Sequence, residues 1–124
     1  MGADTHAKCY RWDDLPEDHP LEKLARRRIV GEKVMIAQVR LQKGCRVPTH
    51  AHANEQFAYL VTGRMRFGIG AENSADRHEL TLSGGEVLHF PPDVPHSAEA
   101  LEDSLVLDIF SPPSEKTGVD RGAH

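Results

Sequence analysis

The sequence has few cysteines, no long hydrophobic run and no excess of positive charge. Its two cysteines, Cys9 and Cys45, form neither a disulfide framework nor a cysteine-based zinc site, and they suit a reducing compartment. No apolar run approaches the ~20 residues that span a bilayer. The first residues contain no hydrophobic targeting segment. We therefore expect a cytoplasmic protein with no membrane partner.

The charge balance argues against a nucleic-acid partner. The formal net charge is −4, whereas nucleic-acid binders usually present a basic surface. A short basic run at residues 26–28 is interpreted as a solvated strand edge, a subunit contact or a contact to an anionic ligand. No helix-turn-helix pattern accompanies it.

Glycine and proline residues punctuate the chain between short apolar runs, which is typical of an all-β sandwich or barrel. The chain of 124 residues is the length of one domain. We expect an N-terminal extension over residues 1–27 that packs on a partner subunit, a barrel over 28–113, and a flexible tail over 114–124. The strands are predicted at 28–41, 56–61, 64–69, 78–82, 86–90, 97–100 and 104–110.

The most informative pattern is a group of histidines with one glutamine. In an extended chain, residues of equal parity share a face, so His50, His52 and Gln56 are expected to point the same way. A second element, Gly85 to His96, contains a proline-rich turn that returns His96 beside the first pair. Imidazole nitrogens and an amide oxygen bind first-row divalent ions. The sequence therefore predicts one metal site.

These residues resemble the two motifs of the cupin superfamily. The first motif reads Gly-x5-His-x-His-x3–4-Glu-x6-Gly, and the second reads Gly-x5-Pro-x-Gly-x2-His-x3-Asn, in which Asp93 stands at the second glycine. The resemblance implies a double-stranded β-helix, the jelly-roll barrel, and a metal held by His50, His52, Gln56 and His96. Gln56 stands where the family has glutamate, and Glu55 is the alternative ligand. Nickel, zinc, iron, manganese and cobalt all suit this neutral set.

The last predicted strand carries a carboxylate among apolar residues. Asp108 and Phe110 share one face, and Leu107 and Ile109 share the other. Asp108 is interpreted as a general acid or base inside the barrel. The alternative is an edge strand whose aspartate faces water.

The same strand is similar to that of the KdgF-like cupins of pectin degradation, which carry Asp-x-Phe-Ser-Pro-Pro. That resemblance implies an enzyme that converts 4,5-unsaturated uronates into their linear keto form, with Asp108 as acid/base and Phe110 as a wall. Those relatives often have an arginine after the double proline, where this chain has Ser114. Arg40, Arg64 and Arg66 are the candidate replacements for binding a small anionic substrate.

Two other functions stay open at this point. One is an iron dioxygenase with a three-histidine site, and the other is a non-catalytic module that binds metal or a small ligand. For every reading we expect a homodimer, because exposed sheet edges and the extension leave surface that a second subunit covers.

Overall fold

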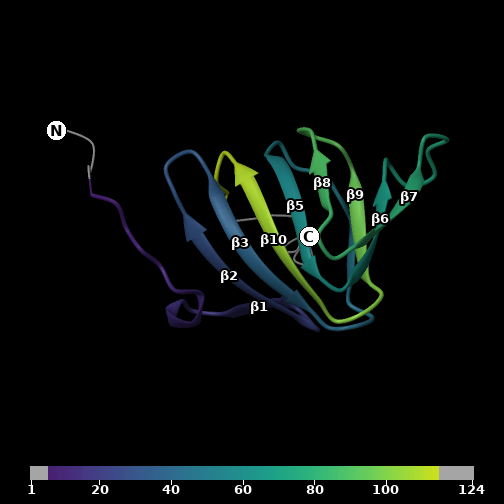
Figure 1. The fold of residues 1–124 in the computed structure, drawn as a ribbon. Coiled ribbons are helices and arrows are strands. Elements are labelled where there is room, and N and C mark those ends of the chain that lie inside the picture. The colour runs from purple at the N-terminus through teal and green to yellow at the C-terminus, as the bar shows by residue number, and fades with distance from the viewer. Residues whose placement is uncertain (1–5, 115–124) are drawn as a thin grey trace.

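The computed structural model describes residues 6–114, which form two antiparallel sheets (Figure 1). The strands are β1 (Asp18–Leu21), β2 (Leu24–Val30), β3 (Met35–Leu41), β4 (Arg46–His50), β5 (Glu55–Thr62), β6 (Arg64–Ile69), β7 (His78–Ser83), β8 (Val87–Phe90), β9 (His96–Ala100) and β10 (Ser104–Ser111). A short 3-10 helix, η1 (Trp12–Asp14), precedes them. Within these residues, no helix has the length and apolar character needed to cross a membrane.

The strand order confirms the prediction of an all-β jelly roll. One sheet has the order β1-β2-β3-β10-β5-β8, and the other has the order β4-β9-β6-β7. Several neighbours in the sheets, such as β3 and β10 or β5 and β8, are not consecutive in the chain, so their pairing is set by tertiary structure. The last long strand, β10, lies between β3 and β5.

The first strands differ from the prediction of one strand over residues 28–41. The chain instead forms a hairpin of β2 and β3, closed where the Gly31 N–H donates to the Val34 carbonyl at 2.8 Å. The sheet also extends into residues 18–27, which the sequence analysis assigned to the extension. Arg26 is able to face inward at 3% exposure because Asp18 accepts hydrogen bonds from its Nε and Nη2. Residues 115–124 of the predicted tail lie outside the described residues.

The hydrophobic core fills the space between the two sheets. Alternate residues of β3 point inward, and Met35, Ala37, Val39 and Leu41 are all nearly fully buried. Leucine, methionine and phenylalanine residues from both sheets meet them. Burial of the larger of these side chains stabilises the fold by roughly 1.5–3 kcal/mol each. The histidines lie at one end of the sandwich.

Candidate metal centre

The histidines reach one point from different elements. His50 ends β4 and is the Cα partner of His96, the first residue of β9. His52 lies in the loop of residues 51–54, and Gln56 belongs to β5 in the other sheet. The prediction that His50, His52 and Gln56 share one face of a single extended segment is therefore wrong. They converge because the chain crosses from one sheet to the other between them.

Hydrogen bonds to backbone carbonyl oxygens orient all three imidazole rings. The Nδ1 atoms of His50, His52 and His96 face the carbonyl oxygens of Pro48 at 2.8 Å, Asn54 at 3.1 Å and Val94 at 2.8 Å. A carbonyl oxygen only accepts, so each Nδ1 carries a proton, and the Nε2 atom of such a ring has a lone pair for a metal whenever the ring is uncharged. One ligand atom from each ring lies within 4.8 Å of the others. This second layer of hydrogen bonds is characteristic of histidine metal ligands.

Gln56 provides a test of whether a cation fits this site. Its Nε2 donates to Asp108 Oδ1 at 2.9 Å, which directs its Oε1 toward His52 Nε2 at 3.1 Å. With the His52 proton on Nδ1, two lone-pair acceptors then face each other. A divalent cation bound by both acceptors removes this repulsion, and neither residue would have to move far. The donor set of three imidazoles and one amide oxygen therefore fits a metal ion.

Burial favours the uncharged form of His96, and aromatic rings pack against two of the histidines. Burial lowers the pKa of His96 to about 4, the hydrogen bond to the Val94 carbonyl opposes this shift, and His50 and His52 add to it. His96 therefore offers an uncharged nitrogen at neutral pH. The ring of Phe90 stacks on His96 with centroids 4.0 Å apart, and Phe110 meets His52 edge-on at 5.6 Å.

Asp108 lies beside this group on a central strand. Because β10 pairs with both β3 and β5, the alternative of an edge strand with a water-facing aspartate is wrong. The Asp108 side chain is half-buried and lines the same pocket as His50, Gln56 and Phe110. Burial raises the pKa of Asp108 to about 6, and the hydrogen bond from Gln56 partly opposes the increase. A carboxyl group with such a pKa exchanges its proton near neutral pH.

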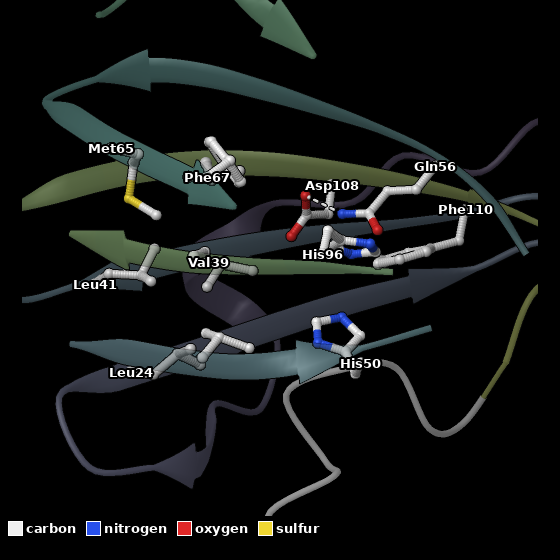
Figure 2. A pocket seen from close by; sticks show the side chains of 13 residues that line it. Leu24, Val39, Leu41, His50, Gln56, Met65, Phe67, His96, Asp108 and Phe110 are labelled. Carbon is white, nitrogen blue, oxygen red and sulfur yellow. Dashed lines mark hydrogen bonds between the residues drawn. The ribbon is translucent and has the colours of Figure 1, made fainter. Parts of the chain in front are cut away.

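The pocket has a polar end and an apolar end (Figure 2). His50, Gln56, His96 and Asp108 gather at the polar end, and the Gln56–Asp108 hydrogen bond connects two of them. The apolar end contains residues of the hydrophobic core, including Leu24, Val39, Leu41, Met65 and Phe67. The polar groups therefore lie beside apolar side chains, and in such surroundings electrostatic interactions are stronger than in water.

The three arginines considered as substrate-binding groups lie elsewhere. Arg40 pairs with Glu17, Arg64 with Glu102, and Arg66 with Glu99. None of the three lines the pocket of the histidines. Their strand positions alternate with buried ones, so they face away from the core.

The sequence analysis missed residues that support the site. Asn54 is 8% exposed, and its Nδ2 donates to the Pro112 carbonyl after β10, while its backbone carbonyl accepts a hydrogen bond from His52 Nδ1. The Asp93 N–H donates to the His52 carbonyl at 2.9 Å from a residue with φ of 67°. The available signals were an asparagine beside the histidine pair and an aspartate where the cupin motif has glycine.

Comparisons with known proteins agree with this architecture. A structure of KdgF from Halomonas sp. superposes with a TM-score of 0.78 at 24% identity, covering 89% of this chain and 97% of that chain. An RmlC-like cupin from Shewanella frigidimarina has a TM-score of 0.78 at 22% identity, covering 89% and 95%. An oxalate decarboxylase of Bacillus subtilis has a TM-score of 0.74 at 24% identity, but only 32% of that chain is covered against 90% of this one. A comparison with curated protein sequences finds no match.

The structural likenesses establish the fold, because the identities are below 25%. The family is established by the sequence model of the cupin domain, which matches residues 37–110. This range covers more than half of the chain and contains all four candidate ligands together with Asp108. The protein therefore belongs to the cupin domain family.

Proposed function

We propose that this cupin is a metal-dependent enzyme that acts on a small anionic sugar acid, with His50, His52, Gln56 and His96 as the metal ligands. When bound, the metal supplies Lewis-acid chemistry toward substrate oxygens. The similar fold of Bacillus subtilis oxalate decarboxylase, which has Mn(II) centres, supports a metal in this scaffold. The observation that carries the proposal is the contact between Gln56 and Asp108, which joins the ligand set to a carboxylate in the same pocket.

A glutamine at position 56 has a specific advantage over the glutamate of the family motif. A glutamate side chain has no N–H to donate, and its charge would lie about as close to Asp108 as the present 2.9 Å contact. Two carboxylates at that distance repel each other, and one of them takes up a proton. Gln56 instead donates to Asp108 and leaves that carboxylate available for proton transfer.

The reaction that best uses these groups is the conversion of a 4,5-unsaturated uronate into its linear keto form. In this isomerisation the C1 hydroxyl loses a proton, the bond between C1 and the ring oxygen breaks, and C4 gains a proton. The enol at C5 becomes a ketone, so no oxidant or reductant is needed. Asp108 is the group that takes up and returns the proton, and Phe110 is the wall against which the sugar ring packs. The fold shared with KdgF from Halomonas sp. is compatible with this assignment.

The assay follows the alkene proton signals of freshly prepared 4,5-unsaturated galacturonate by NMR. We expect the metal-loaded protein to speed their loss relative to buffer containing the same metal. Asp108→Asn should abolish the acceleration while its metal content, measured by mass spectrometry, stays unchanged. Equal rates with and without the wild-type protein would refute the reaction. Full activity in Asp108→Asn would refute the role of that residue alone.

The other two hypotheses lead to different results in the same samples. An iron dioxygenase would consume oxygen when loaded with Fe(II), and a binding module would retain metal without turnover of any uronate. Neither explains why a carboxylate is held against a metal ligand inside the pocket.

A further inference from the structure

The strand that carries His50 departs from regular alternation just before this residue. In β4, Val47 points into the core, so strict alternation would place Thr49 inward and His50 outward. His50 is instead buried and lines the pocket (Figure 2). Such a change of parity within one strand requires an extra residue.

The extra residue forms a β-bulge between β4 and β9. The register changes between Val47 and His50, where residues 48 and 49 lie opposite the single residue Ser97. The first of the two is Pro48, which has no N–H for the ladder, and bulges are among the few sheet positions that accept proline. Its carbonyl accepts the hydrogen bond from His50 Nδ1. The bulge therefore turns His50 inward and also orients its ring.

Arg77 connects the two sides of this bulge on the outer face of the four-stranded sheet. It is half-buried and lies in the loop just before β7. Its Nη1 donates to Thr49 Oγ1 at 3.1 Å, and its Nη2 donates to Ser97 Oγ at 3.0 Å. These two hydroxyl partners are the chain neighbours of the ligands His50 and His96. A guanidinium group is planar and donates in fixed directions, so it sets the spacing between its acceptors.

Further hydrogen bonds hold this arrangement in place. Arg77 Nη1 also donates to the Gly70 carbonyl at 2.7 Å, and the Gly70 N–H donates to the Pro95 carbonyl at 2.8 Å. On the β4 side, Thr49 Oγ1 donates to Glu72 Oε1 at 2.9 Å. The Thr49 hydroxyl is therefore fixed in direction by one donor and one acceptor.

Gly68 provides the space that the guanidinium occupies. The residues before it on the same face of β6, Arg64 and Arg66, carry long side chains. A Cβ at position 68 would lie 2.3 Å from Arg77 Nη2 and 2.6 Å from Ser97 Oγ. Glycine within a strand often marks such a close approach. A residue without a side chain is therefore needed beneath the guanidinium.

We propose that Arg77 is a positioning residue for the metal centre, because it holds the β4 bulge in the form that directs His50 toward His96. The inference rests on the metal ligands of the proposed function and not on its reaction. Loss of the guanidinium removes two hydrogen bonds between the bulge and β9. Residues behind metal ligands typically contribute 10–100-fold to affinity, and Arg77 acts through the ligands' chain neighbours, so a loss of about tenfold is expected.

A role confined to the hairpin of β6 and β7 is the alternative. Arg77 would then stabilise the fold without any influence on the ligands. Of its three acceptors, however, only the Gly70 carbonyl belongs to that hairpin. The other two lie on β4 and β9, on either side of the bulge.

The test measures Co(II) binding by the full chain in competition with a chelating indicator, together with the visible spectrum of the bound ion. Arg77→Ala should bind Co(II) about tenfold more weakly than the wild type, with a changed cobalt spectrum, because the ligand geometry relaxes. The control Arg66→Ala removes another arginine from the outer face of the same sheet, one that pairs with Glu99. It should bind Co(II) as the wild type does. Urea unfolding of the metal-free proteins separates metal binding from stability.

A second variant moves the guanidinium without removing it. In Gly68→Ala the new methyl group would meet Arg77 Nη2 and Ser97 Oγ, which are ends of side chains and can move aside while the strand stays in place. This variant should lose about as much Co(II) affinity as Arg77→Ala does. Adding Gly68→Ala to Arg77→Ala should cause little further loss, because both changes act on the same contact.

The hydroxyl partner of the guanidinium allows a milder test should Arg77→Ala fail to fold. Thr49→Val keeps the shape of the side chain but removes the hydroxyl, so it should weaken Co(II) binding. Thr49→Ser keeps the hydroxyl and should bind Co(II) as the wild type does. Equal affinities of the valine and serine variants would overturn the proposal.

The remaining outcomes separate the role of Arg77 from the metal site itself. Wild-type affinity and an unchanged cobalt spectrum in folded Arg77→Ala, with binding lost in His50→Ala, would overturn the positioning role and support the ligand set. Equal weakening in Arg66→Ala would also overturn the role, since any arginine of this face would then have the same effect. A wild type that binds no Co(II) would overturn the ligand set and this inference together. The measurement uses no uronate, so failure of the proposed reaction leaves the result for Arg77 unchanged.

Discussion

Replacing Asp108 with asparagine should stabilise the metal-free protein while removing its activity. Burial raises the pKa of this carboxyl from 3.8 to about 6 in the folded chain. The folded state therefore binds the proton more tightly than the unfolded state does, and ionising Asp108 in the fold is unfavourable. The contribution of Asp108 to the free energy of unfolding is most favourable below about pH 4. It decreases as the pH rises to about 6 and stays reduced at higher pH.

The magnitude follows from the shift. A difference of roughly 2 pKa units corresponds to about 3 kcal/mol, which is an upper value because the side chain keeps some contact with solvent in the pocket. Asparagine has the same shape, accepts the hydrogen bond from Gln56, and carries no charge. In metal-free protein at about pH 8, Asp108→Asn should be more stable than the wild type by up to about 3 kcal/mol.

The measurement is urea unfolding of both proteins with a chelator present, repeated between about pH 4 and pH 8. The difference in unfolding free energy should shrink toward zero at the acidic end. Saturating divalent metal should also reduce it, because a nearby cation stabilises the carboxylate. Asp76→Asn, which changes an exposed loop residue, is the control and should alter stability little. A pH-independent difference, or a less stable Asp108→Asn at about pH 8, would refute the reasoning.

Three further predictions concern the ligands and the turns. Gln56→Glu should retain metal but lose most activity, because the new carboxylate has no N–H for the neighbouring aspartate. Mass spectrometry measures the metal content and the NMR assay measures turnover, and full activity in this variant would contradict the prediction. His50→Ala should lose bound metal in mass spectrometry, whereas His89→Ala, outside the site, should keep it, and equal metal content in both would exclude His50 as a ligand. Gly63 and Gly85 both have positive φ, but only at Gly63 would a Cβ meet a serine Oγ at 2.3 Å and backbone at 2.6 Å. Gly63→Ala should therefore be less stable than Gly85→Ala by roughly 1–3 kcal/mol in urea unfolding, and equal losses would show that backbone conformation alone matters.

The strand pattern could be predicted well where alternation and turn residues agree. Residues 64–69 form β6 as expected, and the predicted 104–110 strand is β10 with one added residue. The hairpin of β2 and β3 was predicted as one strand, because apolar residues stand on both sides of the short segment Gly31-Glu32-Lys33. Strand β4 was not separated from the histidine segment, since it contains Pro48 and only one buried aliphatic residue. Local patterns carry little information where a charged residue is buried because a distant residue pairs with it, as Asp18 pairs with the buried Arg26.

The residues of the candidate centre were found by their spacing, although the geometric argument for them was wrong. Equal parity grouped His50, His52 and Gln56, but the strand ends at His50 and the two sheets supply different ligands. Asn54 and Phe90 were not found because their roles depend on contacts with segments that are distant in sequence. Asp108 was identified, yet whether it faced water or the pocket required the position of β10 between β3 and β5.

The sequence by itself determined the class of fold, the family and the types of donor atom at the centre, because these depend on alternation, turn residues and motif spacing. Only the tertiary structure decided how the donors meet, and that Gln56 lies between His52 and Asp108. The physical reason is that pairing between distant strands sets which side chains share a face. A single sequence records the residues of each strand, but not the neighbours between which that strand will lie.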